Sequence, residues 1–98
     1  MPLAVLSALS DSTRLGAMLI LSDKGEHCVC ELMARLDATQ SRTSRHMQVL
    51  KRAGLVVDRR DAQWVRYRIN PTLSPHHQTI LDAALAAVAA EPLDRKVA

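Results

Sequence analysis

The stretch from Cys28 to Gly54, CVCELMARLDATQSRTSRHMQVLKRAG, places the strongest constraint on what this chain can fold into. Its first part carries apolar residues at the spacing of one buried helical stripe, namely Val29, Leu32, Met33 and Leu36. Residues 37–39 predict a turn, with Thr39 or Ser41 as the N-cap of a second helix. That helix ends with two basic residues and then Gly54, which is the usual C-terminal chemistry. The pattern predicts a helix-turn-helix over about residues 29–53.

The second of these helices is expected to have two different faces. At about 100° per residue, the apolar side holds Thr43, Met47 and Leu50. The opposite side is small, polar and cationic, with Ser41, Ser44, Arg45, Gln48 and Arg52. Such a helix can pack on one side and contact a partner on the other.

After Gly54 the apolar period changes from helical to alternating. LVVDRR and QWVRYRI predict two strands over about residues 55–69, with Val65, Tyr67 and Ile69 on one side. The connection around Asp61 and Ala62 lacks the glycine that a tight hairpin prefers, so we expect a longer loop at the tip.

The remaining segments predict scaffold helices and no chemistry. Residues 2–9 and 12–21 form two short apolar helices, and residues 74–90 form an alanine-rich helix suited to packing against a second copy. The expected fold is mainly α with a β-hairpin, a winged helix-turn-helix of order α-α-α-α-β-β-α that forms a homodimer. We expect one domain over residues 1–90, with dimerisation through residues 74–90 and a flexible tail over residues 91–98.

Charge is concentrated in one part of the chain. Between Arg42 and Arg68 there are eight Lys and Arg residues against two Asp residues, a net charge of +6, whereas the whole chain carries +3. A cationic segment on an otherwise acidic chain is typical of phosphate binding. The alternatives are a solvated basic face, or a winged helix that docks another protein.

If the partner is double-stranded operator DNA, the start of the second helix enters the major groove. Arg pairs with guanine, Gln with adenine, and Ser with a base or a phosphate. The expected contacts from this helix are Gln40, Ser41, Arg42, Ser44, Arg45 and His46. The expected phosphate or minor-groove contacts from the hairpin are Arg59, Arg60 and Arg66.

Cys28 and Cys30 are the only cysteines. Two cysteines one residue apart do not readily form a relaxed disulfide, which suits a reducing cytoplasm. The N-terminal apolar run lacks a basic region and is broken by Ser7, Ser10 and Asp11, so we predict no signal peptide and no membrane span. The thiols are either buried small residues or donors for a thiophilic ion.

Ion binding would conflict with a helical backbone. Residues two apart lie about 200° around a helix, whereas two sulfurs on one ion at about 2.3 Å each lie within about 4.6 Å. An extended or turned backbone puts both on the same side. We therefore expect ion capture to unwind the first helical turn and displace the reading helix. His27 is a candidate third donor, and Met33 is expected to be core.

Several motifs together resemble the ArsR-type repressors, most closely those of arsenical-resistance operons. They are SDSTRLGAMLIL, CVCELMARL, TQSRTSRHMQVLKRAGLVVDRR and QWVRYRI, and the likeness covers about residues 3–90. The resemblance implies a homodimeric winged-helix repressor, not an enzyme, that leaves its operator when As(III) or Sb(III) binds Cys28 and Cys30. It implies no permanent cofactor and a cytoplasmic location.

The chain departs from this pattern at Met33, where several arsenic repressors carry a third cysteine, so solvent or a small thiol would supply the third ligand. Cadmium sensors add cysteines from an N-terminal arm, and none precedes Cys28. The alternatives are a cadmium-responsive or a redox- or persulfide-responsive repressor of the same fold. A thiol-based metal carrier or oxidoreductase would leave the basic hairpin unexplained.

Overall fold

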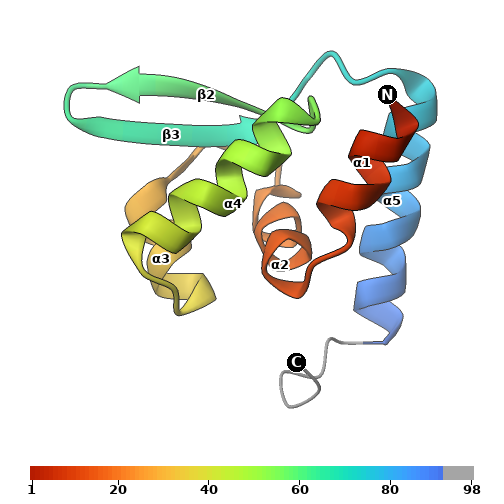
Figure 1. Cartoon of the computed structure of the whole chain (residues 1–98), viewed down its shortest axis with the longest axis horizontal. Coiled ribbons are helices and arrows are strands. Elements are labelled where there is room, and N and C mark those ends of the chain that lie inside the picture. Colours follow the sequence, from red (N-terminus) through yellow and green to blue (C-terminus); the bar gives the residue numbers. More distant parts are fainter. Residues whose placement is uncertain (92–98) are drawn as a thin grey trace.

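The computed structural model describes residues 1–91, in which helices pack together with a small antiparallel sheet whose hairpin projects at one end (Figure 1). The helices are α1 (Pro2–Leu9), α2 (Ser12–Leu21), α3 (Val29–Leu36), α4 (Gln40–Arg52) and α5 (Pro75–Ala90). The strands are β1 (His27–Cys28), β2 (Val56–Asp61) and β3 (Trp64–Ile69). The predicted helices and the predicted hairpin are all present, and most of the tail expected over residues 91–98 lies outside the described residues.

Short polar side chains fix where three of the helices begin. The side chains of Asp11, Thr39 and Ser74 each accept a hydrogen bond from the backbone N–H three residues on, and so cap α2, α4 and α5. At the other end of α4, Gly54 adopts a φ of +80° that favours glycine. The Leu55 N–H then bonds the Leu50 carbonyl at 3.0 Å, which closes the helix as predicted.

The core lies where α2, α3 and α4 meet the sheet, and α1 and α5 extend it. Its fully buried side chains include Met18, Leu21, Leu32, Met47, Leu50, Leu55 and Leu81. Burying each leucine stabilises the fold by about 1.5–3 kcal/mol. A Cβ at Gly16 would lie 3.1 Å from Leu36 Cδ2, so glycine at this position lets α2 approach α3 closely.

The sheet has the order β1-β3-β2, and β1 is a strand that the sequence did not predict. It pairs His27 with Tyr67 and Cys28 with Arg66, so the segment before α3 is joined to the hairpin. The expectation of a longer loop at the hairpin tip is wrong. Asp61 pairs directly with Trp64, and only Ala62 and Gln63 form the turn, with Ala62 at a φ of +56°.

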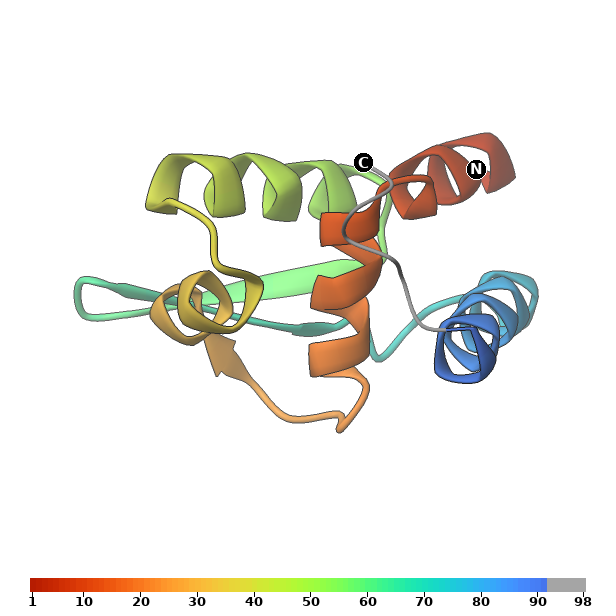
Figure 2. The same cartoon turned by 90° about the horizontal axis from the view of Figure 1, so that it is seen from below.

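The two ends of the molecule are formed by different elements. The β2–β3 hairpin projects from one end, whereas α1 and α5 lie side by side at the other (Figures 1 and 2). The helix α4 runs along one side of the sheet, and α3 lies between α4 and β1 in the chain. Among residues 1–91 no single helix could cross a membrane; only α1 and α2 together, bent by 100°, meet the length and apolarity required.

Candidate functional site

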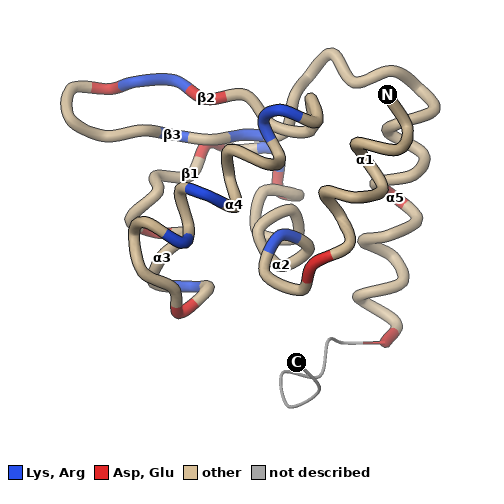
Figure 3. Tube along the Cα trace, in the orientation of Figure 1, with Lys and Arg blue, Asp and Glu red and all other residues tan. Residues whose placement is uncertain are grey.

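The helix α4 has the two faces that its sequence predicts. Thr43, Met47 and Leu50 are buried against the core. The opposite face is solvent-accessible: Gln40, Ser41, Arg42 and Arg45 are exposed, and Ser44 is half-buried. Within residues 1–91 neither Arg42 nor Arg45 forms an ion pair, so both guanidinium groups are available to a ligand. Lys and Arg recur along α4 and on the hairpin (Figure 3).

The hairpin arginines differ in their surroundings. Arg59 donates two hydrogen bonds to the Glu26 carboxylate, at 3.0 and 2.7 Å. Arg66 donates through Nε to Asp61 at 3.0 Å, whereas Arg60 is exposed and forms no ion pair within the described part of the chain. Because side chains alternate along a strand, Arg60 projects from the opposite side of β2 to Arg59. These contacts pre-arrange Arg59 and Arg66 and leave Arg60 free.

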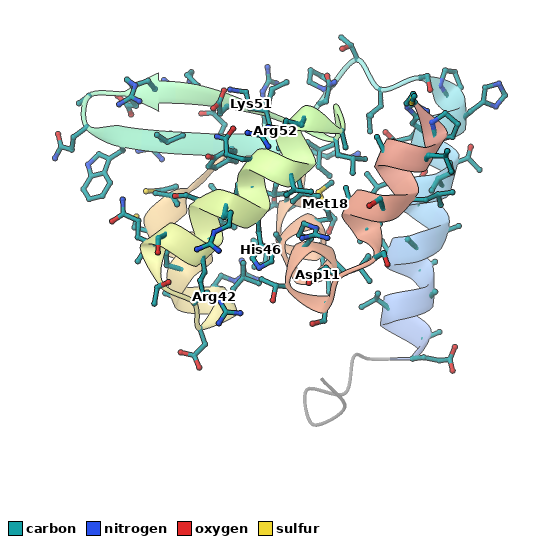
Figure 4. The ribbon with its side chains drawn as sticks, viewed as in Figure 1. Asp11, Met18, Arg42, His46, Lys51 and Arg52 are labelled. Atoms are coloured by element: carbon teal, nitrogen blue, oxygen red, sulfur yellow. The ribbon has the colours of Figure 1, made fainter. Side chains whose placement is uncertain are left out.

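His46 lies on α4 but is less exposed than Arg42 and Arg45. Its side chain is 20% exposed and turns toward the start of α2, where Asp11 lies (Figure 4). Its Nδ1 lies 3.1 Å from a guanidinium nitrogen of Arg14 and 3.9 Å from the Asp11 carboxylate. The structure therefore engages the His46 ring with Arg14, although Arg42, four residues earlier, lies on the same side of α4.

The thiol pair lies where β1 ends and α3 begins. Cys28 is the N-cap of α3 and has an extended backbone, with φ −66° and ψ 147°, while Cys30 lies in the first helical turn. The Cys30 N–H donates to Cys28 Sγ at 3.3 Å. The expected conflict between a helical backbone and a shared ion is therefore wrong in its premise, because Cys28 is already outside the helix.

The two thiols are joined by a hydrogen bond but differ in exposure, since Cys28 is buried and Cys30 is exposed. Burial raises the pKa of Cys28, but hydrogen bonds from the Cys30 thiol and from backbone N–H groups outweigh it and hold that pKa below its usual value. The hydrogen bond to Cys28 is the main cause that raises the pKa of Cys30. The buried sulfur is thus the one that loses its proton first.

His27 is held by carboxylates on both sides. Its Nδ1 lies 2.7 Å from Glu31, and its Nε2 lies 2.8 Å from Asp23. The hydrogen bond to Asp23 raises the pKa of His27, burial opposes it, and Glu31 adds to the rise. Both ring nitrogens are therefore engaged, and neither is available as a third donor without losing a carboxylate.

The donor set at this site consists of the two thiols. Within residues 1–91 no group of three or more His, Cys, Asp and Glu side chains is arranged to hold a metal ion. Met33 is half-buried on α3. Two soft sulfurs, one of them readily deprotonated, fit a thiophilic ion better than a zinc site, which takes three or four protein ligands.

Sequence reasoning missed the contacts that surround the thiols. Asp23, His27 and Glu31 are spaced by four, but that spacing indicates contact only within a continuous helix, and here it spans a loop, a strand and a helix start. The pairing of Glu26 with Arg59 joins residues 33 apart. No local pattern reports such a contact.

The chain is similar to known proteins both in sequence and in fold. Residues 11–57 match the family described as bacterial regulatory protein, arsR family. The chain is 42% identical over 84 residues to the arsenical resistance operon repressor of Escherichia coli, covering 86% of this chain and 72% of that protein. It is 44% identical over 86 residues to the arsenic resistance transcriptional regulator ArsR2 of Pseudomonas putida, covering 88% and 75%.

Solved structures of similar proteins have the same fold. HlyU from Vibrio cholerae superposes with a TM-score of 0.77 at 31% identity, over 90% of this chain and 91% of that chain. The homodimeric winged helix-turn-helix DNA-binding domain of a possible ArsR-family regulator from Mycobacterium bovis gives a TM-score of 0.73 at 28% identity, over 95% and 82%. With the α3–turn–α4 unit, the hairpin and this similarity, the chain belongs to the ArsR family of winged helix-turn-helix, DNA-binding transcriptional regulators.

Proposed function

We propose that this chain is a repressor that binds operator DNA as a homodimer and leaves it when As(III) or Sb(III) binds Cys28 and Cys30. The observation that carries the proposal is the placement of the two thiols. Cys28 ends β1, which pairs with β3 of the hairpin, and Cys30 lies in α3, the helix before α4. The similarity to arsenical-resistance repressors supports the choice of ion.

The DNA contacts follow from the exposed face of α4. Its N-terminal half would lie in the major groove, where Gln40 and Arg45 reach base edges and Ser41, Arg42 and Ser44 reach bases or phosphates. Arg60 would contact a phosphate from the hairpin. Arg59 and Arg66 would do so as well once DNA competes with Glu26 and Asp61 for their guanidinium groups.

The chemistry of the thiols fits a soft trivalent ion. The lowered pKa of Cys28 means that its thiolate forms at a lower pH than that of an ordinary cysteine. The neighbouring Cys30, which is exposed to solvent, supplies the second sulfur. With His27 held by two carboxylates, solvent or a small thiol would supply the third ligand. Arsenous acid would exchange two of its hydroxyl groups for the two sulfurs, and these groups would leave as two water molecules with the two thiol protons.

Release of DNA requires that ion binding favour a different arrangement of the β1–α3 junction. An ion that holds both sulfurs ties the end of β1 to the first turn of α3, and α3 packs against both α4 and β3. The ion shifts the equilibrium only by its difference in affinity for the two arrangements. A 100-fold loss of DNA affinity needs about 2.7 kcal/mol of coupling, within the usual range.

The homodimer would form through α1 and α5. Leu3 and Leu6 of α1 are 75% and 51% exposed, and Met1 beside them is exposed as well. The neighbouring α5 presents alanines such as Ala83, Ala86 and Ala87 to solvent. Small residues allow close approach of a second copy, which would bury this apolar surface. The similar domain from Mycobacterium bovis is homodimeric, which supports the formation of a dimer.

The test is a fluorescence-anisotropy titration of the reduced protein against a labelled duplex that carries the promoter of its own operon. Arsenite, antimonite, cadmium and zinc are added in separate arms. Arsenite and antimonite are expected to release the wild-type protein, and the Cys28→Ser, Cys30→Ser double variant is expected to stay bound. If the double variant is released at the wild-type arsenite concentration, the metalloid assignment fails and the repressor assignment survives.

A second candidate is a repressor of the same fold that senses oxidants or persulfide. The lowered pKa of Cys28 favours it, because the thiolate is the reactive form. Hydrogen peroxide and an organic persulfide therefore form two further arms of the same titration. Release by either of these at concentrations where arsenite has no effect would select this candidate.

A further inference from the structure

Arg14 of α2 joins three helices through its side chain. Its Nε donates to the Ala8 carbonyl at 2.6 Å, and a terminal nitrogen donates to the Ser7 carbonyl at 3.5 Å. These carbonyls belong to the last turn of α1, and the Ser7 carbonyl also accepts the Ser10 N–H at 3.1 Å. The other terminal nitrogen lies 3.1 Å from Nδ1 of His46, on α4. One guanidinium group therefore links the end of α1 to the middle of α4.

The contact with His46 has only one consistent assignment. A guanidinium group has donors and no acceptor, so Nδ1 must accept and the ring proton must lie on Nε2. The nearest carboxylate, Asp11, lies 3.9 Å from Nδ1, and one of its oxygens already accepts the Arg14 backbone N–H at 3.0 Å. The imidazole is thus a fixed acceptor that faces α2 (Figure 4).

We propose that Arg14 is a positioning residue for α4, which it fastens through His46 to the joint between α1 and α2. The proposal rests on the function proposed above. The helix α1 lies beside α5 at the end of the molecule where the second copy would bind (Figure 1). The Arg14–His46 bond would then set how far apart the two α4 helices of a dimer are held.

That separation matters because a helix-turn-helix dimer reads two half-sites about one helical turn, or about 34 Å, apart. A loosened α4 can still meet phosphates, but it no longer meets both half-sites with one fixed geometry. We therefore expect His46 to limit which half-site spacings the protein can bind. A direct base contact, as the sequence suggests for His46, would instead affect one base position and leave the preferred spacing unchanged.

The test uses a duplex that the wild-type protein selects from a random library, and two further duplexes with one base pair added or removed between the half-sites. His46→Leu removes the acceptor. His46→Asn is the matched control, because its side-chain oxygen takes the place of Nδ1. Thermal midpoints and dimer mass are measured for each variant, so that a loss of folding is separated from a loss of positioning.

His46→Leu is expected to bind the selected duplex roughly ten-fold more weakly, the upper end for one lost hydrogen bond, and to bind the respaced duplexes with little further loss. His46→Asn should restore wild-type affinity and spacing preference. The inference is overturned if His46→Leu weakens all three duplexes equally, if it weakens none, or if His46→Asn is as impaired as His46→Leu. If the wild-type protein selects no duplex, the proposed function fails and this inference fails with it.

A second measurement does not depend on any variant. Nitrogen-15 spectra of the His46 ring are recorded for the wild-type protein, free and bound to the selected duplex. An unprotonated Nδ1 in both states is expected. A ring whose protonated nitrogen changes on binding DNA would show that the bond to Arg14 is exchanged for a contact with DNA, and would overturn the inference.

Discussion

Cys28 and Arg66 lie opposite each other in the β1–β3 ladder, so the buried thiol and the hairpin share one pair of strands. The positive charge of Arg66 lowers the pKa of Cys28, but it does so less than burial and the hydrogen bonds from Cys30 affect that pKa. Because β1 pairs with β3, a displacement of Cys28 is expected to move β3 of the hairpin as well. Cys28, which is proposed to bind the ion, and Arg66, which is proposed to bind DNA, therefore lie on neighbouring strands.

The opposed pKa shifts of the two thiols predict how each responds to loss of the other. In Cys30→Ala the hydrogen bond that stabilises the Cys28 thiolate is absent, so the pKa of Cys28 should rise above its wild-type value. In Cys28→Ala the pKa of Cys30 should fall, because its proton is no longer held by a neighbouring sulfur. Ultraviolet absorbance of the thiolate, followed against pH, measures both. Single variants that titrate at the wild-type values would show that the thiols do not interact.

Most of the fold was predictable because it depends on local patterns. The cap at Thr39, the buried stripe of Thr43, Met47 and Leu50, and the stop at Gly54 all lie where the sequence places them. The hairpin tip was not predictable. Ala62 accepts a φ of +56° that favours glycine, because the ladder between β2 and β3 holds the strands together on either side of it.

The site was predictable in its residue types but not in its connections. The sequence singles out Cys28, Cys30 and the basic face of α4, yet it does not reveal that Cys28 belongs to a strand. The strand β1 is two residues long, and its partner lies 38 or more residues further on. His46 is a similar case. Its orientation depends on Arg14, 32 residues earlier, and helical spacing alone cannot report that contact.

The hydroxyl of Thr43 predicts a stabilising substitution. This side chain is fully buried, and its Oγ1 has no hydrogen-bond partner within the described residues. Thr43→Val has the same shape without the unsatisfied polar atom, so it should raise the free energy of unfolding by about 1 kcal/mol. Urea denaturation measures the change. Thr79→Val is the matched control, because its hydroxyl is bonded to the Pro75 carbonyl at 2.9 Å and its loss should give no gain.

Arg42 and Arg45 should differ from other surface cations in their effect on DNA binding. If Arg45 pairs with a base, Arg45→Ala should cost about 1–3 kcal/mol and relax preference at one position. If Arg42 contacts a phosphate, Arg42→Ala should weaken all duplexes and lower the slope of log affinity against log salt by about 0.9. Affinity measured over a series of salt concentrations separates these roles.

The control for this series is Lys24→Gln. Lys24 is exposed in the loop between α2 and β1, which lies on the far side of the molecule from α4 (Figure 2). Lys24→Gln removes one positive charge, as Arg42→Ala does, but leaves the proposed interface intact. The affinity for DNA and its salt dependence should therefore stay close to the wild-type values. Equal losses in Lys24→Gln and Arg42→Ala would mean that only net charge matters and that α4 has no special role.

The His27 cluster predicts a pH dependence of stability. The hydrogen bond to Asp23 raises the pKa of His27 above its ordinary value of 6.5, against the effect of burial. A raised pKa means that the folded state keeps its proton longer, so this stabilisation is complete below pH 6.5 and is lost as the pH rises through the folded pKa. The pKa values of Asp23 and Glu31 are lowered, chiefly by their hydrogen bonds to His27, so their contribution is lost in acid.

The measurement is the free energy of unfolding of wild type and His27→Gln from about pH 5 to pH 9, a range that covers histidine titration. The difference between them should be largest near the acidic end and should shrink as His27 loses its proton. His76→Gln, at an exposed position at the start of α5, is the control for the loss of a histidine side chain. A difference that stays constant with pH would mean that His27 is held by packing and its neutral hydrogen bonds, and that the folded state does not retain its proton.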